Sequence, residues 1–297
     1  MADVKDLQNG WLGIKAGDEA FMKAEKEFIK FQILGKGPDK PGPSIWRLAK
    51  RVNNNKNLPT WYQQIGDCCS MGATQVIDYL QIAQVVSGKD STIEYHPVFP
   101  PYIYGISRTA KDCGNGDIFG DGSTGAWTAT ACKNHGVLFC DDEGVPKYSG
   151  SIARSWGNSG PPARFQEIAK DNCVKSIARL TTVDELRDAL INYHFCTIAS
   201  TWGFEVGKKD GYKVYNKSGS WAHQMCFIAW MDDPFPAAFR LNSWGDSTGP
   251  SLHGEPLGGA WQPAESIKKE LTTGVELYAY SQFDGFPAAD SGRYSFI

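Results

Sequence analysis

Two adjacent cysteines, Cys68 and Cys69, lie in the segment QQIGDCCSMGA at 63–73. The apolar residues after them recur at three- to four-residue intervals, which predicts a helix that begins at the cysteines. A helix N-terminus stabilises a thiolate and lowers the pKa of a cysteine placed there. One of the two thiols is therefore a candidate nucleophile, although a free cysteine is more often a buried packing residue.

A histidine and an asparagine follow in the second half of the chain. His223 opens an apolar run at 223–230, and Asn242 lies near the end of the next run, at 238–244. Short apolar runs bounded by Gly, Pro and Asp predict strands, and two neighbouring strands would bring these side chains together. A thiol, an imidazole that shares its proton and a group that orients the imidazole make up a nucleophilic triad.

These segments resemble those of the papain-like (C1) cysteine proteases. The likeness rests on NSWG at 242–245, on His223 before an apolar strand and on the order Cys, His, Asn, and it covers roughly residues 44 to 282. IGDCCSM stands where the family usually has a CGSCW motif, which is similar to divergent bacterial or bacteriophage members. The resemblance implies an α+β fold of two lobes: a helical lobe with the nucleophile helix, an antiparallel, β-barrel-like lobe and a cleft between them.

The resemblance also implies a role for each site residue. Cys68 would attack the scissile carbonyl, His223 would carry the proton, and Asn242 would orient the imidazole. The remaining expected site residues are one of Gln63 and Gln64 as the oxyanion donor, Gly122 and Ser123 as binders of the substrate backbone, and Trp244 as a shield over the His–Asn hydrogen bond.

Two patterns disagree about which cysteine is the nucleophile. The family's oxyanion glutamine lies six residues before the cysteine, and Gln63 has this spacing to Cys69. Small residues two, four and five positions after the nucleophile favour Cys68, because Ser70, Gly72 and Ala73 all fit, whereas Met71 would crowd the contact made from Cys69. We expect Cys68 to be the nucleophile. A vicinal disulfide between the two cysteines that silences the enzyme is a further hypothesis.

Composition changes along the chain and predicts three parts. Residues 1–43 form an N-terminal extension with a Pro/Gly linker at 35–43 and an amphipathic helix at 16–31, whose apolar side is formed by Phe21, Ala24, Phe28 and Phe31. Helical spacing dominates 44–180, with further helices expected near 102–109 and 125–135. A helix near 182–193 and short strands at 195–200, 223–230, 238–244 and 275–280 are expected in 181–297, which ends in a C-terminal tail. A helix-rich lobe followed by a strand-rich lobe is typical of an α+β protein.

Bulk properties exclude several classes of function. The 297 residues carry a net charge of −3, so the chain lacks the excess of positive charge typical of proteins that bind nucleic acid. No stretch approaches the roughly 20 apolar residues that cross a bilayer, and the N-terminus has no secretory signal. The eight cysteines include no CxxC pair, so we expect no metal and no cofactor. Because no secretory signal is visible, we expect reduced thiols. We expect a cytoplasmic or virion-associated enzyme whose partner is a protein or peptide substrate.

Two other functions compete with peptidase activity. A papain-like fold could serve as a structural or binding component of a larger assembly such as a phage particle, docked through residues 1–43. The same 43 residues could instead be an activation segment. Related thiol chemistry, such as transglutaminase or peptidoglycan amidase activity, is disfavoured by NSWG, because those enzymes typically use another third group.

Overall fold

The structure is a computed structural model that describes residues 10–31, 45–87 and 94–281. In chain order its helices are α2 (Glu19–Lys26), α3 (Ile45–Val52), α4 (Cys68–Ser87), α5 (Pro100–Thr109), α6 (Gly125–Asn134), α7 (Gly150–Ser159), α8 (Ala163–Ala169), α9 (Val183–Ile191), α10 (Ala264–Glu270) and the 3₁₀ turn η1 (Leu271–Thr273). The strands are β1 (Ile29–Lys30), β2 (Ser176–Arg179), β3 (Cys196–Lys209), β4 (Tyr212–Met231), β5 (Ala237–Leu241), β6 (Gly259–Pro263) and β7 (Glu276–Ser281). The fold is α+β.

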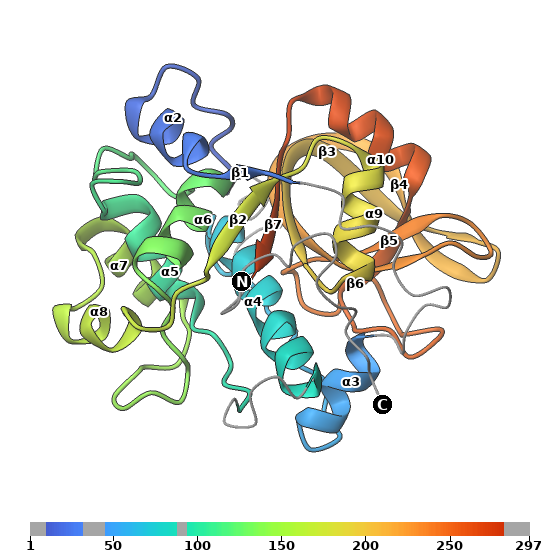
Figure 1. Cartoon of the computed structure of the whole chain (residues 1–297), viewed down its shortest axis with the longest axis horizontal. Helices are drawn as coiled ribbons and strands as arrows, with labels where there is room; N and C mark the ends of the chain where they lie inside the picture. The colour runs from blue at the N-terminus through green and yellow to red at the C-terminus, as the bar shows by residue number, and fades with distance from the viewer. Residues whose placement is uncertain (1–9, 32–44, 88–93, 282–297) are drawn as a thin grey trace.

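Helices and strands separate in space as they do in sequence. α5, α6, α7 and α8 gather on one side of the molecule, and the sheet lies on the other, with α4 between them (Figure 1). The strand order is β1-β2-β7-β3-β4-β5-β6, and most neighbours run antiparallel. β4 also pairs with β6, at Val214 and Trp261, because the long β3–β4 hairpin curls until the sheet is barrel-like.

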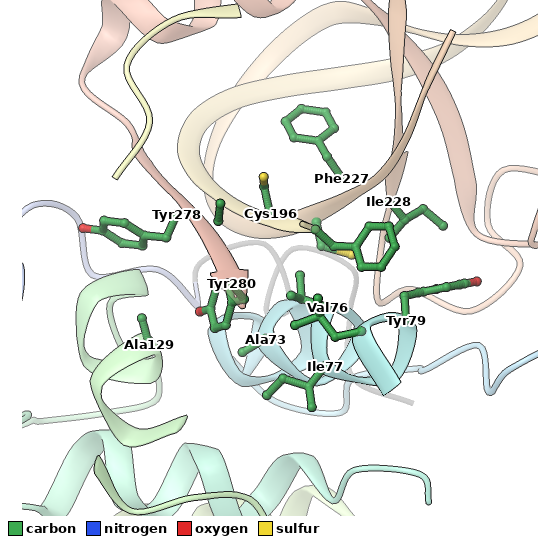
Figure 2. Packing of buried hydrophobic residues seen from close by; sticks show 14 of the residues in the cluster. Ala73, Val76, Ile77, Tyr79, Ala129, Cys196, Phe227, Ile228, Tyr278 and Tyr280 are labelled. Carbon is green, nitrogen blue, oxygen red and sulfur yellow. The ribbon is translucent and has the colours of Figure 1, made fainter. Parts of the chain in front are cut away.

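Helix α4 is the central element, and it is buried along most of its length. Its residues from Cys68 to Ala83 are all buried, as expected for a helix enclosed on every side. Val76 on the sheet-facing side of α4, Ile77 on its opposite side, Ala129 of α6 and the strand residues Cys196 and Phe227 all belong to one buried hydrophobic cluster (Figure 2). α4 is therefore enclosed by both helices and sheet.

Glycine on α4 allows the helix to approach β4 closely. A Cβ atom on Gly72 would lie 3.2 Å from Nε2 of Gln224 and 3.3 Å from the carbonyl oxygen of Met225. Both residues follow His223 directly on β4. The small residue four positions after Cys68 thus brings the helix start and the histidine strand together.

The expected helix at 16–31 is shorter in the structure. α2 ends at Lys26, and β1 pairs in parallel with β2 instead of continuing the helix. Phe21, Ala24, Phe28 and Phe31 are nevertheless all buried, as their spacing predicted. Phe31 also donates its N–H to the carbonyl of Arg179, so pairing with the sheet satisfies a backbone N–H group that a longer helix would have paired internally.

Other expected elements appear close to their predicted places. The helices near 102–109, 125–135 and 182–193 correspond to α5, α6 and α9, and the four apolar runs correspond to β3, β4, β5 and β7. The linker at 35–43 and the tail after residue 281 lie outside the described residues. Within the described part of the chain, no helix combines the length and apolar character needed to span a bilayer.

Candidate active site

Cys68 is the first residue of α4 and is completely buried. The turn before the helix is fixed from within, since the carbonyl of Asp67 accepts hydrogen bonds from the Ser70 hydroxyl at 2.8 Å and from the N–H of Met71 at 3.1 Å. The thiol sulfur accepts a hydrogen bond from the N–H of Gln224 at 3.4 Å. A sulfur held at a helix N-terminus among donors is stabilised as a thiolate.

His223 and Asn242 meet across neighbouring strands. Nε2 of His223 on β4 lies 2.8 Å from Oδ1 of Asn242, which follows β5 directly. The same oxygen accepts the N–H of Ser243 at 2.7 Å, and the N–H of Asn242 donates to the carbonyl of Gly258. The turn after β5 therefore fixes Asn242, and Asn242 fixes the plane of the His223 imidazole.

Trp244 covers the histidine ring. Its ring centroid lies 4.7 Å from that of His223, with the planes 26° apart, and Phe204 stacks on Trp244 with the ring centroids 5.8 Å apart. Asn242 and His223 are both buried. Trp244 thus stacks on the imidazole that bonds to Asn242, and its role as a shield against water stays a prediction.

The Cys68 thiol interacts with the imidazole. Burial alone would raise the pKa of Cys68, but the neighbouring Cys69 thiol and the His223 imidazole lower that pKa well below its ordinary value. Since Asn242 engages Nε2, Nδ1 is the ring nitrogen left for the thiol. The pair can therefore exist as thiolate and imidazolium, the form in which a cysteine is a nucleophile.

Cys69 differs from its neighbour. Burial, together with the adjacent Cys68, raises the pKa of Cys69 well above its ordinary value. Its sulfur lies 3.4 Å from the carbonyl oxygen of Ser123, to which it donates. Cys69 is thus a protonated donor next to the Cys68 sulfur, and both cysteines are free thiols in the structure.

The two glutamines before the cysteines face different parts of the molecule. Gln63 is buried, its Oε1 accepts the Ser243 hydroxyl at 2.6 Å, and its N–H donates to the Ser243 carbonyl. Gln64 instead accepts the N–H of Gly150 at the start of α7, through its Oε1 at 3.0 Å. Of the two candidates, Gln63 is the one joined to the asparagine segment.

A segment of the N-terminal extension lies over Cys68. Gly10 accepts the N–H of Ser123 at 3.0 Å, and the N–H of Leu12 donates to the carbonyl of Ser123 at 2.8 Å. Trp11 therefore forms a parallel bridge with Ser123 and packs with Cys68 and Cys69. Ser123 thus pairs with the backbone of this segment, and its expected binding of a substrate backbone stays a prediction. Gly122, the other predicted binder, makes no such bond to residues 10–12; its N–H and carbonyl are held from α5.

Sequence analysis did not identify two buried carboxyl groups at this site. Glu276 on β7 accepts the indole N–H of Trp11 at 3.0 Å and the N–H of Ala126 at 2.7 Å, and burial raises its pKa to about 8. Asp67 accepts the Tyr148 hydroxyl at 2.9 Å, and burial raises its pKa to about 8 as well. The position of Asp67 directly before Cys68 is a sequence signal for that carboxyl group, whereas the sequence carries no signal for Glu276. No group of three His, Cys, Asp or Glu side chains that could hold a metal ion occurs among the described residues.

Comparisons with known proteins identify the fold. No protein-family model matches this sequence, and no curated protein matches it. Among solved structures, xylellain, a cysteine protease from Xylella fastidiosa, is 13% identical with a TM-score of 0.61, over 94% of this chain and 97% of that chain. The Amb a 11 cysteine protease of ragweed pollen, in its proform, is 14% identical with a TM-score of 0.56, over 95% and 79%. Procathepsin B S9 from Trypanosoma congolense is 10% identical with a TM-score of 0.56, over 94% and 88%. This chain therefore has the two-lobe fold of the papain-like cysteine proteases.

Proposed function

We propose that this chain is a cysteine peptidase that hydrolyses peptide bonds through a thioacyl-enzyme intermediate. The observation that carries the proposal is the buried arrangement of Cys68, His223 and Asn242. The pKa of the Cys68 thiol is lowered beside an imidazole, and the 2.8 Å contact with Asn242 fixes that imidazole. A fold alone does not define an activity, but this set of groups is what nucleophilic acyl transfer requires.

The chemistry follows from the positions of these groups. The Cys68 thiolate attacks the scissile carbonyl carbon, and the new oxyanion is stabilised by the N–H of Cys68 and the amide of Gln63. His223 then gives its proton to the leaving amine as the C–N bond breaks. Water attacks the thioester while His223 takes a proton from it, the C–S bond breaks, and the acid product leaves.

Residues 10–12 close this site in the described structure. Gly10 lies directly against the Cys68 sulfur, and Trp11 fills the space beside Cys69 and Glu276. We infer that this part of the extension is an activation segment that must move before a substrate can bind. Ser123 would then offer the same backbone N–H and carbonyl to a peptide substrate, by strand addition.

The geometry does not favour a purely structural role for the fold. A scaffold has no need for a thiol of lowered pKa or for an imidazole fixed by Asn242 and covered by Trp244. Docking through residues 1–43 onto an assembly stays a prediction. On the IGDCCSM motif we propose a divergent member of bacterial or bacteriophage type, in the cytoplasm or associated with a virion.

Labelling with an epoxide that traps papain-like thiols tests the proposal. The reagent is applied to the full chain carrying Gly10→Val, which we expect to uncover Cys68, and the product is mapped by mass spectrometry. A Cys69→Ser variant should be labelled at Cys68 and should cleave a peptide library, whereas Cys68→Ala should do neither. Peptide cleavage that persists in Cys68→Ala would overturn the assignment.

A further inference from the structure

The loop that joins α5 to α6 carries the peptide-pairing residue Ser123, yet little hydrophobic packing holds it. Residues 115–117 and 120 are exposed, and Phe119 at the tip of the loop is fully exposed. Among the described residues, Trp11 is the only strand-like partner of the loop at Ser123. A loop of this kind keeps one conformation only if specific hydrogen bonds fix its backbone.

Backbone turn bonds hold residues 113–117, and a single buried guanidinium holds the second half of the loop, at 118–122. Arg108, near the end of α5, donates to the carbonyl oxygens of Ile118 at 3.2 Å, Gly120 at 2.7 Å and Gly122 at 2.5 Å. Its Nε donates to the carbonyl of Gly157 on α7 at 2.9 Å. Arg108 is only 2% exposed, so main-chain carbonyl dipoles stabilise its buried positive charge. The guanidinium is rigid and planar, and it therefore fixes several carbonyls at once.

Two other residues on the same face of α5 complete the arrangement. The Tyr104 hydroxyl accepts the N–H of Gly122 at 2.9 Å, and the hydroxyls of Ser107 and Ser123 are 2.9 Å apart. Positions i, i+3 and i+4 share one face of a helix, so these side chains act together. Both backbone groups of Gly122 are thus held from α5, and the backbone groups of Ser123 remain directed at the peptide over Cys68.

We propose that Arg108 is a positioning residue for the peptide-binding strand, assisted by Tyr104. By fixing Gly122 and the loop before it, Arg108 keeps the N–H and carbonyl of Ser123 in line with a peptide backbone. It does not touch the reacting atoms. The present occupant is the segment 10–12, and under the proposed function the later occupant is the substrate.

Thiol alkylation of the full chain tests this inference without any peptidase activity. In wild type, Gly10 covers Cys68, so iodoacetamide should react with it slowly. In Arg108→Met, Ser123 should no longer hold residues 10–12, and we expect the alkylation rate of Cys68 to rise tenfold or more. Cys132 of α6 and Cys226 of β4 are buried in the core and should stay protected, as mapped by mass spectrometry.

Matched variants keep this test decisive. Arg154→Met removes the exposed ion pair with Asp121 in the same loop and should leave the Cys68 rate unchanged. Tyr104→Phe removes one hydrogen bond to Gly122, should fold even if Arg108→Met does not, and should raise the rate severalfold. Either of two results would overturn the inference. One is an unchanged alkylation rate of Cys68 in folded Arg108→Met or in Tyr104→Phe, and the other is an equal increase in the alkylation rates of Cys132 and Cys226.

A second measurement rests on the proposed function. In the Gly10→Val background, Tyr104→Phe and Arg108→Met should raise KM for peptide substrates about tenfold with little change in kcat, because only backbone binding is weakened. Absence of cleavage in the parent would contradict the proposed function and would leave the alkylation result as the test of Arg108. A fall in kcat with unchanged KM would count against a positioning role.

Discussion

Gly10 and Cys68 are in such close contact that residue 10 can carry no side chain without a shift. A Cβ atom there would lie 2.7 Å from the Cys68 sulfur and 2.7 Å from the carbonyl oxygen of Gly66. Real Cβ atoms do not approach other atoms this closely, and Gly66 contributes backbone that cannot turn away. The glycine is therefore what allows the extension to lie over Cys68.

Gly10→Val should uncover Cys68. Overpacking of a tight contact costs about 1–3 kcal/mol, so the open form should become roughly 5- to 100-fold more populated. The measurement is the rate at which iodoacetamide alkylates Cys68 in the full chain. Ala16→Val adds bulk at an exposed position of the same N-terminal extension and is the control. Equal rates in the two variants would contradict the prediction.

Trp11→Phe should loosen the same segment by a different route. The ring is kept, but Glu276 loses the indole N–H that now lies 3.0 Å from its carboxyl. An unsatisfied buried acceptor costs about 1–3 kcal/mol, so the alkylation rate of Cys68 should again rise roughly 5- to 100-fold. Trp46→Phe is the control, because the Trp46 N–H makes no hydrogen bond to any described residue. Equal effects of the two substitutions would show that the Glu276 contact is unimportant.

Glu276 should make stability depend on pH. Burial raises its folded-state pKa to about 8 from an ordinary value of 4.5, so the folded state holds a proton that the unfolded state releases. Its contribution is fully present below pH 4.5 and is lost as the pH rises through about 8. Glu276→Gln cannot titrate, so its stability relative to wild type should increase from pH 5 to pH 8, by at most about 1.4 kcal/mol per pH unit. Denaturant unfolding at several pH values measures this, and a constant difference would contradict it.

Asn242→Ala should impair turnover more than binding. Without Oδ1 the imidazole of His223 loses its 2.8 Å partner and can turn away from Cys68. Under the proposed function, kcat should fall on the order of 100-fold while KM changes little. Steady-state kinetics in the Gly10→Val background measures both constants. The fold should be intact by circular dichroism, and an unchanged kcat would remove Asn242 from the mechanism.

The buried ion pair beneath the histidine strand should be important for folding. Glu270 and Arg240 are almost fully buried and lie 2.8 Å apart, and Glu270 also accepts from Gln262 and from Ser200, the β3 partner of His223. Glu270→Ala would leave Arg240 as an uncompensated buried charge, which typically costs about 3–5 kcal/mol. Asp232→Ala breaks the exposed pair with Arg187 and should cost under about 1 kcal/mol. Urea unfolding compares the two, and similar losses would contradict the prediction.

Local patterns in the sequence were enough to place the main elements. The three- to four-residue spacing after Cys68 predicted α4, and the apolar runs predicted β3, β4, β5 and β7, because helices and strands bury one face at their own period. The burial of Phe28 and Phe31 was predicted as well, although they follow α2 instead of belonging to it. There, pairing with β2 outweighed helical spacing, and pairing between distant segments leaves no local signal.

The sequence by itself determined the α+β class, the order of Cys68, His223 and Asn242, and the helix start and strands that carry them. The tertiary structure alone decided that Gln63 faces the asparagine segment, that residues 10–12 cover the thiol, and that Glu276 and Arg108 are buried near the site. These features depend on contacts between residues up to 265 positions apart, such as Trp11 and Glu276. Periodicity and capping describe neighbours along the chain, whereas burial, pKa and the choice of a hydrogen-bond partner arise only when distant segments pack together.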